Sequence, residues 1–365
     1  MKIFEVIPQL SQGGAERFVL DLSNNLSKAN DVTLIVFHSI DDNAFLLNEL
    51  SPEVKLIVLN KNKGIDLSVV YKLIRLIRKH KPDVVHSHLR SILYLSFPSL
   101  FFSKVKFIHT VHSDAQTEAG RGLSLFLRRR LFRKKFTPIT ISKTSQKSFD
   151  DFYGYDNVLI YNGSVPYVRS QKYASTSEQL SQLRITPSTK IILNVARVNR
   201  YKNQLSLVKA VADIRESGED LQLVIIGDLQ DSEITAEIMK YGYSFVHLLG
   251  AKENPRDYMD LADCFCLSSI YEGMPLSLIE CFSVGCVPVC TPVGGILDVI
   301  DDSVNGILAE GIETSDVQTA LRRFLAMSPQ QINDMQRASR DTYNKFSMQT
   351  CSDRYEQLMK KMCSK

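Results

Sequence analysis

Two carboxylates, Glu272 and Glu280, stand on either side of a predicted helix start, where they could bind a ligand. The apolar run Cys264–Leu267 predicts a buried strand, and Pro275 suits the first position of the following helix, where an N–H group is not needed. A helix N-terminus has unpaired N–H groups and a positive dipole end, which favour phosphate. Carboxylates beside it can accept hydrogen bonds from hydroxyls on both sides of a diphosphate. The pattern therefore predicts a site for a sugar nucleotide.

Two cations, Arg197 and Lys202, follow the predicted strand Ile191–Ala196 and precede a helix predicted near Asn203. We expect them where the carboxyl edge of a parallel sheet meets a helix N-terminus, the usual ligand crevice of open α/β folds. Arginine offers a planar fork to phosphate oxygens, and lysine a mobile point charge. Taken alone, such a pair is more often a solvated basic turn. Beside the two carboxylates, it favours a phosphate site.

Gly13 and Gly14 follow the first predicted strand, Ile3–Ile7, and open a helix predicted over Ala15–Leu26. Because glycine has no Cβ, the backbone N–H groups here can approach a ligand closely. A lone Gly-Gly pair is usually only a turn, and the dinucleotide-binding pattern Gly-x-Gly-x-x-Gly is absent at this position. The pair by itself therefore indicates no ligand class.

Four histidines, His86, His88, His109 and His112, fall at the ends of two predicted strands. Metal ligation is conceivable for such a group, but no carboxylate-rich segment accompanies it in the sequence. We therefore predict no metal site. His86, His88 and His109 are interpreted as structural or acceptor-side groups.

Short apolar runs alternate with longer amphipathic patterns, as in βαβ units with parallel sheets. We predict an α/β protein with two doubly wound domains, over residues 1–165 and 189–346. Residues 166–188 are rich in Ser, Tyr, Gln and Thr without clear periodicity and predict a linker, whereas residues 347–363 predict a final amphipathic helix. The predicted strands are Ile3–Ile7, Val32–Phe37, Lys55–Leu59, Val84–Ser87, Lys106–Val111, Pro138–Ile141, Ile191–Ala196, Leu221–Gly227, Phe245–Leu249, Cys264–Leu267 and Val287–Cys290.

The composition is that of an ordinary globular protein, with 44% hydrophobic and 23% charged residues in a chain of 365. No signal-peptide pattern is visible, and the apolar stretch Ile92–Phe102 is too short to span a bilayer. All seven cysteines lie at or beyond Cys264, and five of them occur in apolar contexts without interleaved histidine. We predict reduced core thiols and hence a cytosolic compartment.

The net charge of +4 is unevenly distributed, which indicates a negatively charged partner on the N-terminal side. Residues 1–160 contain 23 Lys and Arg against 15 Asp and Glu (net +8), and the remainder contains 21 against 25 (net −4). Within Leu123–Phe136, six cations are interleaved with Leu and Phe, which suits an anionic membrane surface. The alternative is a surface helix whose basic side chains cover the core. No nucleic-acid-binding motif accompanies the charge, so we predict no nucleic-acid partner.

The combination of motifs resembles the retaining glycosyltransferases of family 4, also called glycosyl transferases group 1, which have the GT-B architecture. The resemblance rests on the Glu272–Glu280 segment with Gly-Met-Pro-Leu-Ser inside it, and on the loop Gln12–Arg17. It rests further on Tyr161–Gly163, and on Asn194–Arg197 with the following Lys-Asn pair. The order and spacing of these motifs extend the likeness over nearly the whole chain.

The resemblance implies two Rossmann-like domains facing across a cleft, with the last helix packed back on the N-terminal domain. It implies that Arg197 and Lys202 stabilise the departing diphosphate and that Glu272 binds the donor sugar. His112 matches the family's Thr-Val-His motif, which implies a place near the hydroxyls of the donor sugar. The other donor-binding residues implied by the resemblance are Gly13, Gly14, Asn162, Gly273, Met274, Pro275, Leu276, Ser277 and Glu280, of which Glu280 would accept hydrogen bonds from ribose and Asn162 would shape the cleft.

The activity implied by the resemblance is transfer of a sugar, with retention of configuration, from a nucleotide-sugar donor such as a UDP-sugar. The implied acceptor is a lipid-linked saccharide used to build lipopolysaccharide, O-antigen, capsule or exopolysaccharide at the inner face of the cell membrane. The chain has no Asp-x-Asp, the pair with which transferases of the other main fold hold a divalent cation, so we expect metal-independent activity without a cofactor. A sugar-nucleotide epimerase of the same fold and a non-catalytic binding subunit are the alternatives.

Overall fold

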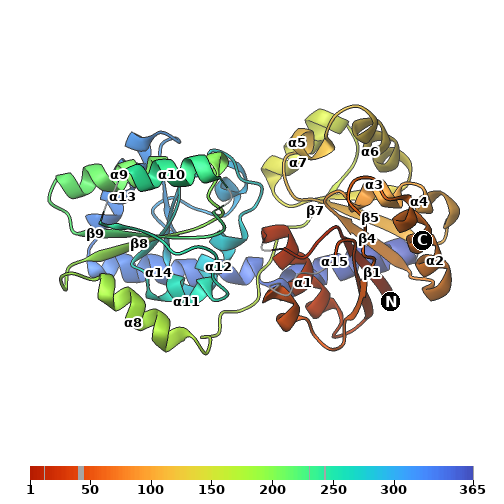
Figure 1. Ribbon diagram of the computed structural model, residues 1–365, viewed down its shortest axis with the longest axis horizontal. Coiled ribbons are helices and arrows are strands. Elements are labelled where there is room, and N and C mark those ends of the chain that lie inside the picture. The colour runs from red at the N-terminus through yellow and green to blue at the C-terminus, as the bar shows by residue number, and fades with distance from the viewer. Residues whose placement is uncertain (12, 40–44, 230, 242–243, 365) are drawn as a thin grey trace. The chain divides into compact units, whose positions relative to one another are not determined.

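The computed structural model of the chain describes residues 1–11, 13–39, 45–229, 231–241 and 244–364 (Figure 1). The chain forms two compact units. Unit 1 comprises Met1–Val165 and Ser347–Lys365, and unit 2 comprises Pro166–Phe346. Each unit is built on its own parallel sheet, which confirms the predicted α/β class with two doubly wound sheets.

Unit 1 has a seven-stranded sheet in the order β3-β2-β1-β4-β5-β6-β7. Its central strands are buried along nearly their whole length, as expected for a parallel sheet covered by helices on both faces. The strands are β1 (Lys2–Ile7), β2 (Asp31–Val36), β3 (Lys55–Val58), β4 (Val84–His88), β5 (Lys106–Val111), β6 (Phe136–Thr140) and β7 (Val158–Leu159). The helices are α1 (Gly14–Leu26), η1 (Phe45–Glu49), α2 (Leu67–His80), α3 (Ser91–Leu95), α4 (Pro98–Phe101), α5 (Ala115–Ala119), α6 (Leu123–Lys134), α7 (Lys143–Tyr153) and α15 (Met348–Cys363).

The C-terminal helix α15 completes unit 1, where it contacts α1 and β5. The backbone around Gly163 meets the start of this helix so closely that an added Cβ would lie 2.7 Å from Cys351 Cβ. Met348 N donates to Ser164 O over 2.8 Å at the same place. The Asn-Gly step before the domain boundary is therefore explained in part by packing, because only glycine admits the helix this near.

Unit 2 has a six-stranded sheet in the order β10-β9-β8-β11-β12-β13. The Val-, Ile- and Leu-rich strands and the helices beside them enclose a core of buried aliphatic side chains. The strands are β8 (Lys190–Val195), β9 (Leu221–Ile226), β10 (Val246–Leu248), β11 (Cys264–Leu267), β12 (Val287–Cys290) and β13 (Ile307–Leu308). The helices are α8 (Tyr173–Leu183), η2 (Arg200–Lys202), α9 (Gln204–Glu216), α10 (Ser232–Lys240), α11 (Pro255–Leu261), α12 (Leu276–Val284), η3 (Gly294–Asp298), α13 (Thr314–Leu325), α14 (Pro329–Tyr343) and η4 (Asn344–Phe346).

The composition of residues 166–188 predicts a linker between the domains, but the segment is part of unit 2. It contains α8, which packs on α11. Thr176 and Leu180, one helical turn apart, are its buried positions, so its apolar stripe is too narrow to stand out among Ser and Gln residues. The composition of the segment therefore does not reveal α8, which is stabilised by its contact with α11.

Cysteine burial agrees with the prediction of reduced core thiols. The five cysteines of β11, α12, β12 and the turn between them are free and buried, whereas Cys363 near the C-terminus is free and exposed. Among the residues that the structure describes, none of the helices has the length and apolar character needed to cross a membrane.

Candidate active site

The candidate site of unit 2 lies where its sheet changes winding direction. From β8 the chain proceeds outward to β9 and β10 on one side, and β11, β12 and β13 lie on the other. Because β8 and β11 are parallel neighbours, the loops after them emerge at one sheet edge. In open α/β sheets this switch point is where ligands bind.

Lys202 and Glu272 meet at this edge, although 70 positions separate them in the sequence. The Nζ atom of Lys202 lies 2.6 Å from Oε1 of Glu272. The Lys202 side chain retains 23% of its exposure and the Glu272 side chain 7%, so the pair is mostly shielded but open on one side. Such a pair can exchange its internal contact for a phosphate and a hydroxyl when a ligand enters.

Hydrogen bonds and close backbone packing hold the Glu272 loop in place. Ser269 Oγ donates to Oε1 of Glu272 over 2.7 Å, and the Thr291 hydroxyl donates to Ser269 O over 2.6 Å. Gly294 approaches the backbone of Glu272 so closely that a Cβ at Gly294 would stand 1.7 Å from the Glu272 carbonyl oxygen. These contacts limit the positions that the carboxylate can occupy.

The loops after β8 and β11 are also joined by hydrogen bonds to main-chain carbonyl groups. Ser268 Oγ donates to the carbonyl oxygens of Lys202 and Asn203, each over 3.0 Å, and Ile270 N donates to Tyr201 O over 2.8 Å. The two loops therefore form one rigid platform, which keeps the cations and the carboxylate in register.

Arg197 is exposed at the same edge, while its backbone is anchored. Gln204, the first residue of α9, donates from Nε2 to Arg197 O over 3.0 Å. Among the described residues, no ion pair is formed by the Arg197 guanidinium. The side chain thus suits recruitment of a phosphate from solution.

The helix after the Glu272 loop begins one residue later than predicted. Pro275 occupies the N-cap position with extended backbone (φ −69°, ψ 118°), and α12 begins at Leu276. Met274, Pro275 and Leu276 are buried, whereas Gly273, Ser277 and Glu280 are partly exposed. The N-cap role follows from ψ, since a helical N1 residue would need a negative value.

The predicted site residues of unit 1 lie at the corresponding edge of its sheet. Gly13 is the N-cap of α1, after β1, and Gly14 is the first residue of that helix. His112 follows β5, and its backbone N–H donates to Glu118 Oε2 over 2.9 Å. Asn162 is buried just before Gly163. Gln12, which belongs to the same predicted glycine loop, lies outside the described residues.

The histidines are accompanied by a carboxylate, contrary to our expectation from the sequence. Glu5 of β1 is fully buried and lies 2.8 Å from Nε2 of His88 and 2.9 Å from Nδ1 of His86. Burial raises the pKa of Glu5, which the hydrogen bond from His88 partly offsets. Burial also lowers the pKa values of His86 and His88 well below their ordinary value, so both rings are neutral near pH 7.

A second buried group surrounds His109. Arg128 Nη1 lies 3.0 Å from Glu118 Oε1, and His109 Nε2 lies 2.8 Å from the same oxygen. Although burial would raise the pKa of Glu118, the hydrogen bond from His109 and the charges of His109 and Arg128 hold it at about 2. Glu118 is therefore an anion that links the His112 backbone to the sheet.

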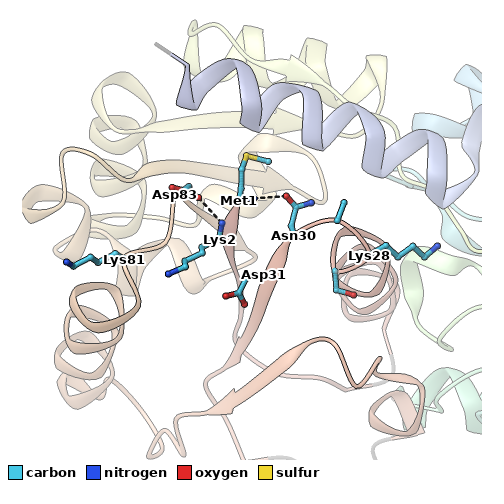
Figure 2. A pocket seen from close by; sticks show the side chains of 9 residues that line it. Met1, Lys2, Lys28, Asn30, Asp31, Lys81 and Asp83 are labelled. Carbon is cyan, nitrogen blue, oxygen red and sulfur yellow. Dashed lines mark hydrogen bonds between the residues drawn. The ribbon is translucent and has the colours of Figure 1, made fainter.

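A pocket lies at the opposite, amino-terminal edge of the unit 1 sheet. Figure 2 shows this pocket of about 730 Å³ with the side chains that line it. Its polar groups already pair with one another, since the amino group of Met1 donates to Asn30 and Lys2 N donates to Asp83. Ligand sites of open α/β sheets lie at the carboxyl ends of strands, so we assign this pocket no role.

Comparisons with known proteins agree with this architecture. Residues 12–164 match the family model described as Glycosyltransferase Family 4, and residues 175–342 match the model described as Glycosyl transferases group 1. A crystal structure of Anabaena HepE in complex with UDP and glucose superposes with a TM-score of 0.83 at 18% identity, covering 99% of this chain and 100% of that one.

Curated relatives include two enzymes of Campylobacter jejuni. One, named GalNAc-alpha-(1->4)-GalNAc-alpha-(1->3)-diNAcBac-PP-undecaprenol alpha-1,4-N-acetyl-D-galactosaminyltransferase, is 26% identical over 323 residues, which is 84% of each chain. The other, named N-acetylgalactosamine-N,N'-diacetylbacillosaminyl-diphospho-undecaprenol 4-alpha-N-acetylgalactosaminyltransferase, is 36% identical over 140 residues, which is 37% of each chain. The chain belongs to glycosyltransferase family 4 and is a glycosyltransferase with the GT-B fold.

Proposed function

We propose that the protein transfers a sugar, with retention, from a UDP-sugar to a lipid-linked saccharide during surface polysaccharide biosynthesis. The observation that carries the proposal is the contact between Lys202 and Glu272 at the switch point of unit 2. A cation that can bind phosphate thus lies beside a carboxylate that can accept hydrogen bonds from hydroxyls. The names of the Campylobacter relatives, which act on undecaprenyl diphosphate-linked saccharides, and the UDP bound by HepE support the choice of substrates.

In the proposed mechanism, Arg197 and Lys202 offset the negative charge that develops on the departing diphosphate. Glu272 accepts a hydrogen bond from the donor sugar, and Glu280, on the first turns of α12, accepts one from ribose. Same-face attack lets the leaving phosphate help to take the proton of the acceptor hydroxyl. The cations thus supply the charge stabilisation that a divalent metal supplies in other transferases.

A donor screen tests this function. Each nucleotide sugar is incubated with the protein and membrane extract, and nucleotide release is measured. We expect release from one UDP-sugar that depends on the extract and adds the sugar to its lipid fraction. Release of a free sugar that is epimerised at one carbon, without an acceptor, would instead identify a sugar-nucleotide epimerase, and no turnover of any donor would favour a binding subunit.

The proposed activity needs no divalent metal. With metal-stripped protein and excess EDTA, we expect most of the transfer rate to remain, because the leaving group is stabilised by side chains. The measurement is the initial rate with and without EDTA. Complete loss that magnesium or manganese restores would refute this part of the mechanism.

The two carboxylates are expected to act on different parts of the donor. Glu280→Ala should weaken UDP binding roughly tenfold, the loss of about 1.5 kcal/mol for a charge-assisted hydrogen bond. Glu272→Ala should leave UDP affinity nearly unchanged and impair sugar transfer. Calorimetry with UDP on both variants checks this, and equal losses of affinity would contradict the assignment.

Membrane attachment through α6 is the remaining part of the proposal, with one correction. Arg128 does not face solvent as the count of six cations assumes, because it is 1% exposed and paired with Glu118. Five cations of the segment are exposed, as are Leu123 and Phe126. The available set is therefore Arg129, Arg130, Arg133, Lys134 and Lys135. We propose that this surface holds the protein at the inner face of the membrane.

Replacing these five cations with Gln should abolish the preference for anionic over neutral vesicles in sedimentation. At about 1 kcal/mol per cation near an anionic surface, the set gives strong but salt-sensitive attraction. A control of equal charge change uses five exposed cations of unit 2, and it should pellet as the unaltered protein does. The control positions are Arg200, Lys240, Arg322, Arg337 and Lys345. Unchanged pelleting of the α6 variant would show that α6 is only a solvated helix.

A further inference from the structure

Glu5 lies at the centre of a continuous chain of buried polar groups in unit 1. Glu5 and His86 are directly opposite each other in the register of β1 and β4, and His88 is two residues further along β4. Nitrogen–oxygen contacts of 2.8, 2.9 and 3.1 Å converge on the Glu5 carboxyl group from the two rings. All three side chains are fully buried, so the contacts take the place of water.

The chain of hydrogen bonds extends in two directions from Glu5. On one side, His88 Nδ1 lies 2.9 Å from His112 Nε2. On the other side, His86 Nε2 lies 2.8 Å from Thr110 Oγ1, which lies 2.8 Å from the hydroxyl of Tyr355 on α15. Every member belongs to unit 1, and His112 is the partly exposed end.

The donors and acceptors along this chain can be assigned in order. The three contacts that converge on the Glu5 carboxyl group suit its ionised form, which only accepts hydrogen bonds, and in that form His86 Nδ1 and His88 Nε2 both carry protons. A neutral imidazole has one N–H group, which leaves Nδ1 of His88 as an acceptor. That atom can accept only from Nε2 of His112. The remaining nitrogen of His112, Nδ1, therefore keeps its lone pair.

Neighbouring rings prevent His88 and His112 from turning away from this arrangement. Phe18 of α1 is fully buried and packs edge-on against both, with ring centroids 6.3 Å from His88 and 5.8 Å from His112. The ring centroids of His86 and His88 are 4.0 Å apart. The packing fixes the ring planes, and the carboxylate determines which nitrogens are protonated.

We propose that Glu5, acting through His88, is a positioning residue that holds His112 in its Nε2-protonated form. Nδ1 of His112 then presents a hydrogen-bond acceptor to a sugar hydroxyl rather than a donor. The identity of the partner as a sugar hydroxyl rests on the proposed function. The assignment of the protons rests only on the buried chain of hydrogen bonds.

Among the described residues, the group of side chains that could hold a metal ion consists of the same three, Glu5, His86 and His88. Ligands of a tetrahedral zinc stand about 3.3 Å apart, given bonds of about 2.0–2.1 Å. The contacts of 2.8–3.1 Å are shorter and fit hydrogen bonds. The geometry therefore favours a proton-ordered network over a metal centre.

The test is a long-range ¹H–¹⁵N spectrum of the full-length protein with ¹⁵N-labelled histidine, near pH 7 and without substrates. Single His→Gln variants assign the rings. We expect Nε2-protonated His88 and His112 with Nδ1-protonated His86. The proposal is overturned if His88 and His112 are both protonated on Nδ1, the arrangement that a protonated Glu5 donating to His88 would produce. Stoichiometric zinc in the purified protein would also overturn it.

Two variants test whether Glu5 determines this order. Glu5→Leu removes both carboxylate oxygens, so no acceptor holds the proton of His88 on Nε2, and we expect His88 and His112 each to populate both tautomers. Tyr355→Phe removes only the far end of the chain and should leave His88 and His112 unchanged. A single, unaltered tautomer of both His88 and His112 in a folded Glu5→Leu protein would overturn the role of Glu5. Because these spectra need no donor or acceptor, a wrong substrate assignment leaves their outcome unaffected.

Discussion

Replacing Arg197 with Ala is expected to lower turnover by roughly 30- to 1000-fold, the consequence of about 2–4 kcal/mol added to the barrier. The guanidinium is exposed and has no described ion pair, so its loss leaves no buried charge behind. The backbone of the loop stays anchored by the bond from Gln204. The expected change is therefore chemical rather than structural, and binding of free uridine should be nearly unaffected.

Lys202→Ala is expected to reduce turnover by a similar factor, with an additional effect on Glu272. Because Nζ of Lys202 lies 2.6 Å from a carboxylate that is 7% exposed, its removal leaves a shielded charge without its cation. Thermal unfolding of Lys202→Ala with and without Glu272→Gln measures this additional effect, because Gln carries no charge that needs a cation. A rate loss in Lys202→Ala with an unchanged free energy of unfolding reflects leaving-group stabilisation.

Arg200→Ala is the matched control for both substitutions. Arg200 is an exposed cation of the same loop, in η2 between the two proposed phosphate-binding residues. It should retain turnover within about twofold, as surface substitutions away from special features do. Initial rates and uridine affinities of the three single variants are the measurements. Wild-type turnover in both Arg197→Ala and Lys202→Ala would remove the basis of the assigned phosphate site.

The proximity of Lys202 and Glu272 could be predicted because each follows a strand of the same parallel sheet. All such strands end at one edge, so residues placed just after them share that edge wherever they occur in the sequence. What the sequence does not contain is the order of the strands. That β8 and β11 are neighbours, with the winding reversed between them, depends on tertiary packing.

The role of Glu5 illustrates what sequence patterns leave out. A carboxylate inside the apolar strand Lys2–Ile7 is the available signal, since a buried charge requires a partner. The partners, His86 and His88, become apparent only from the register of β1 with β4. The sequence therefore indicates the histidines but not the carboxylate that orders them.

Arg128 is a second example, because charge counts treat every cation of a basic helix as solvated. Glu118, which neutralises Arg128, belongs to α5, a separate short helix preceding α6. A helical repeat indicates which face an Arg occupies, but not whether an acid on another element meets it there. Pairing of this kind is specified by the packing of α5 and α6 on the sheet.

Gly294→Ala is expected to disable the site even though Gly294 has no proposed contact with substrate. Its φ of +54° is unfavourable for alanine, and the new Cβ would stand 1.7 Å from the Glu272 carbonyl oxygen. Both overlapping groups belong to the backbone, so no rotamer change can relieve the collision. The Glu272 loop must move, and displacing a reacting group by about 1 Å can cost roughly 100-fold in rate.

Gly250→Ala is the control that isolates this collision from backbone strain. Gly250 also has positive φ, at +66°, but an added Cβ would meet nothing within 4 Å. It should lose about 1 kcal/mol of stability with turnover retained, whereas Gly294→Ala should lose at least about 2 kcal/mol more. Thermal unfolding and initial rates of both variants decide the matter. Equal losses of stability with full activity in Gly294→Ala would show that the Glu272 loop tolerates displacement, and that its fixed position is not needed for transfer.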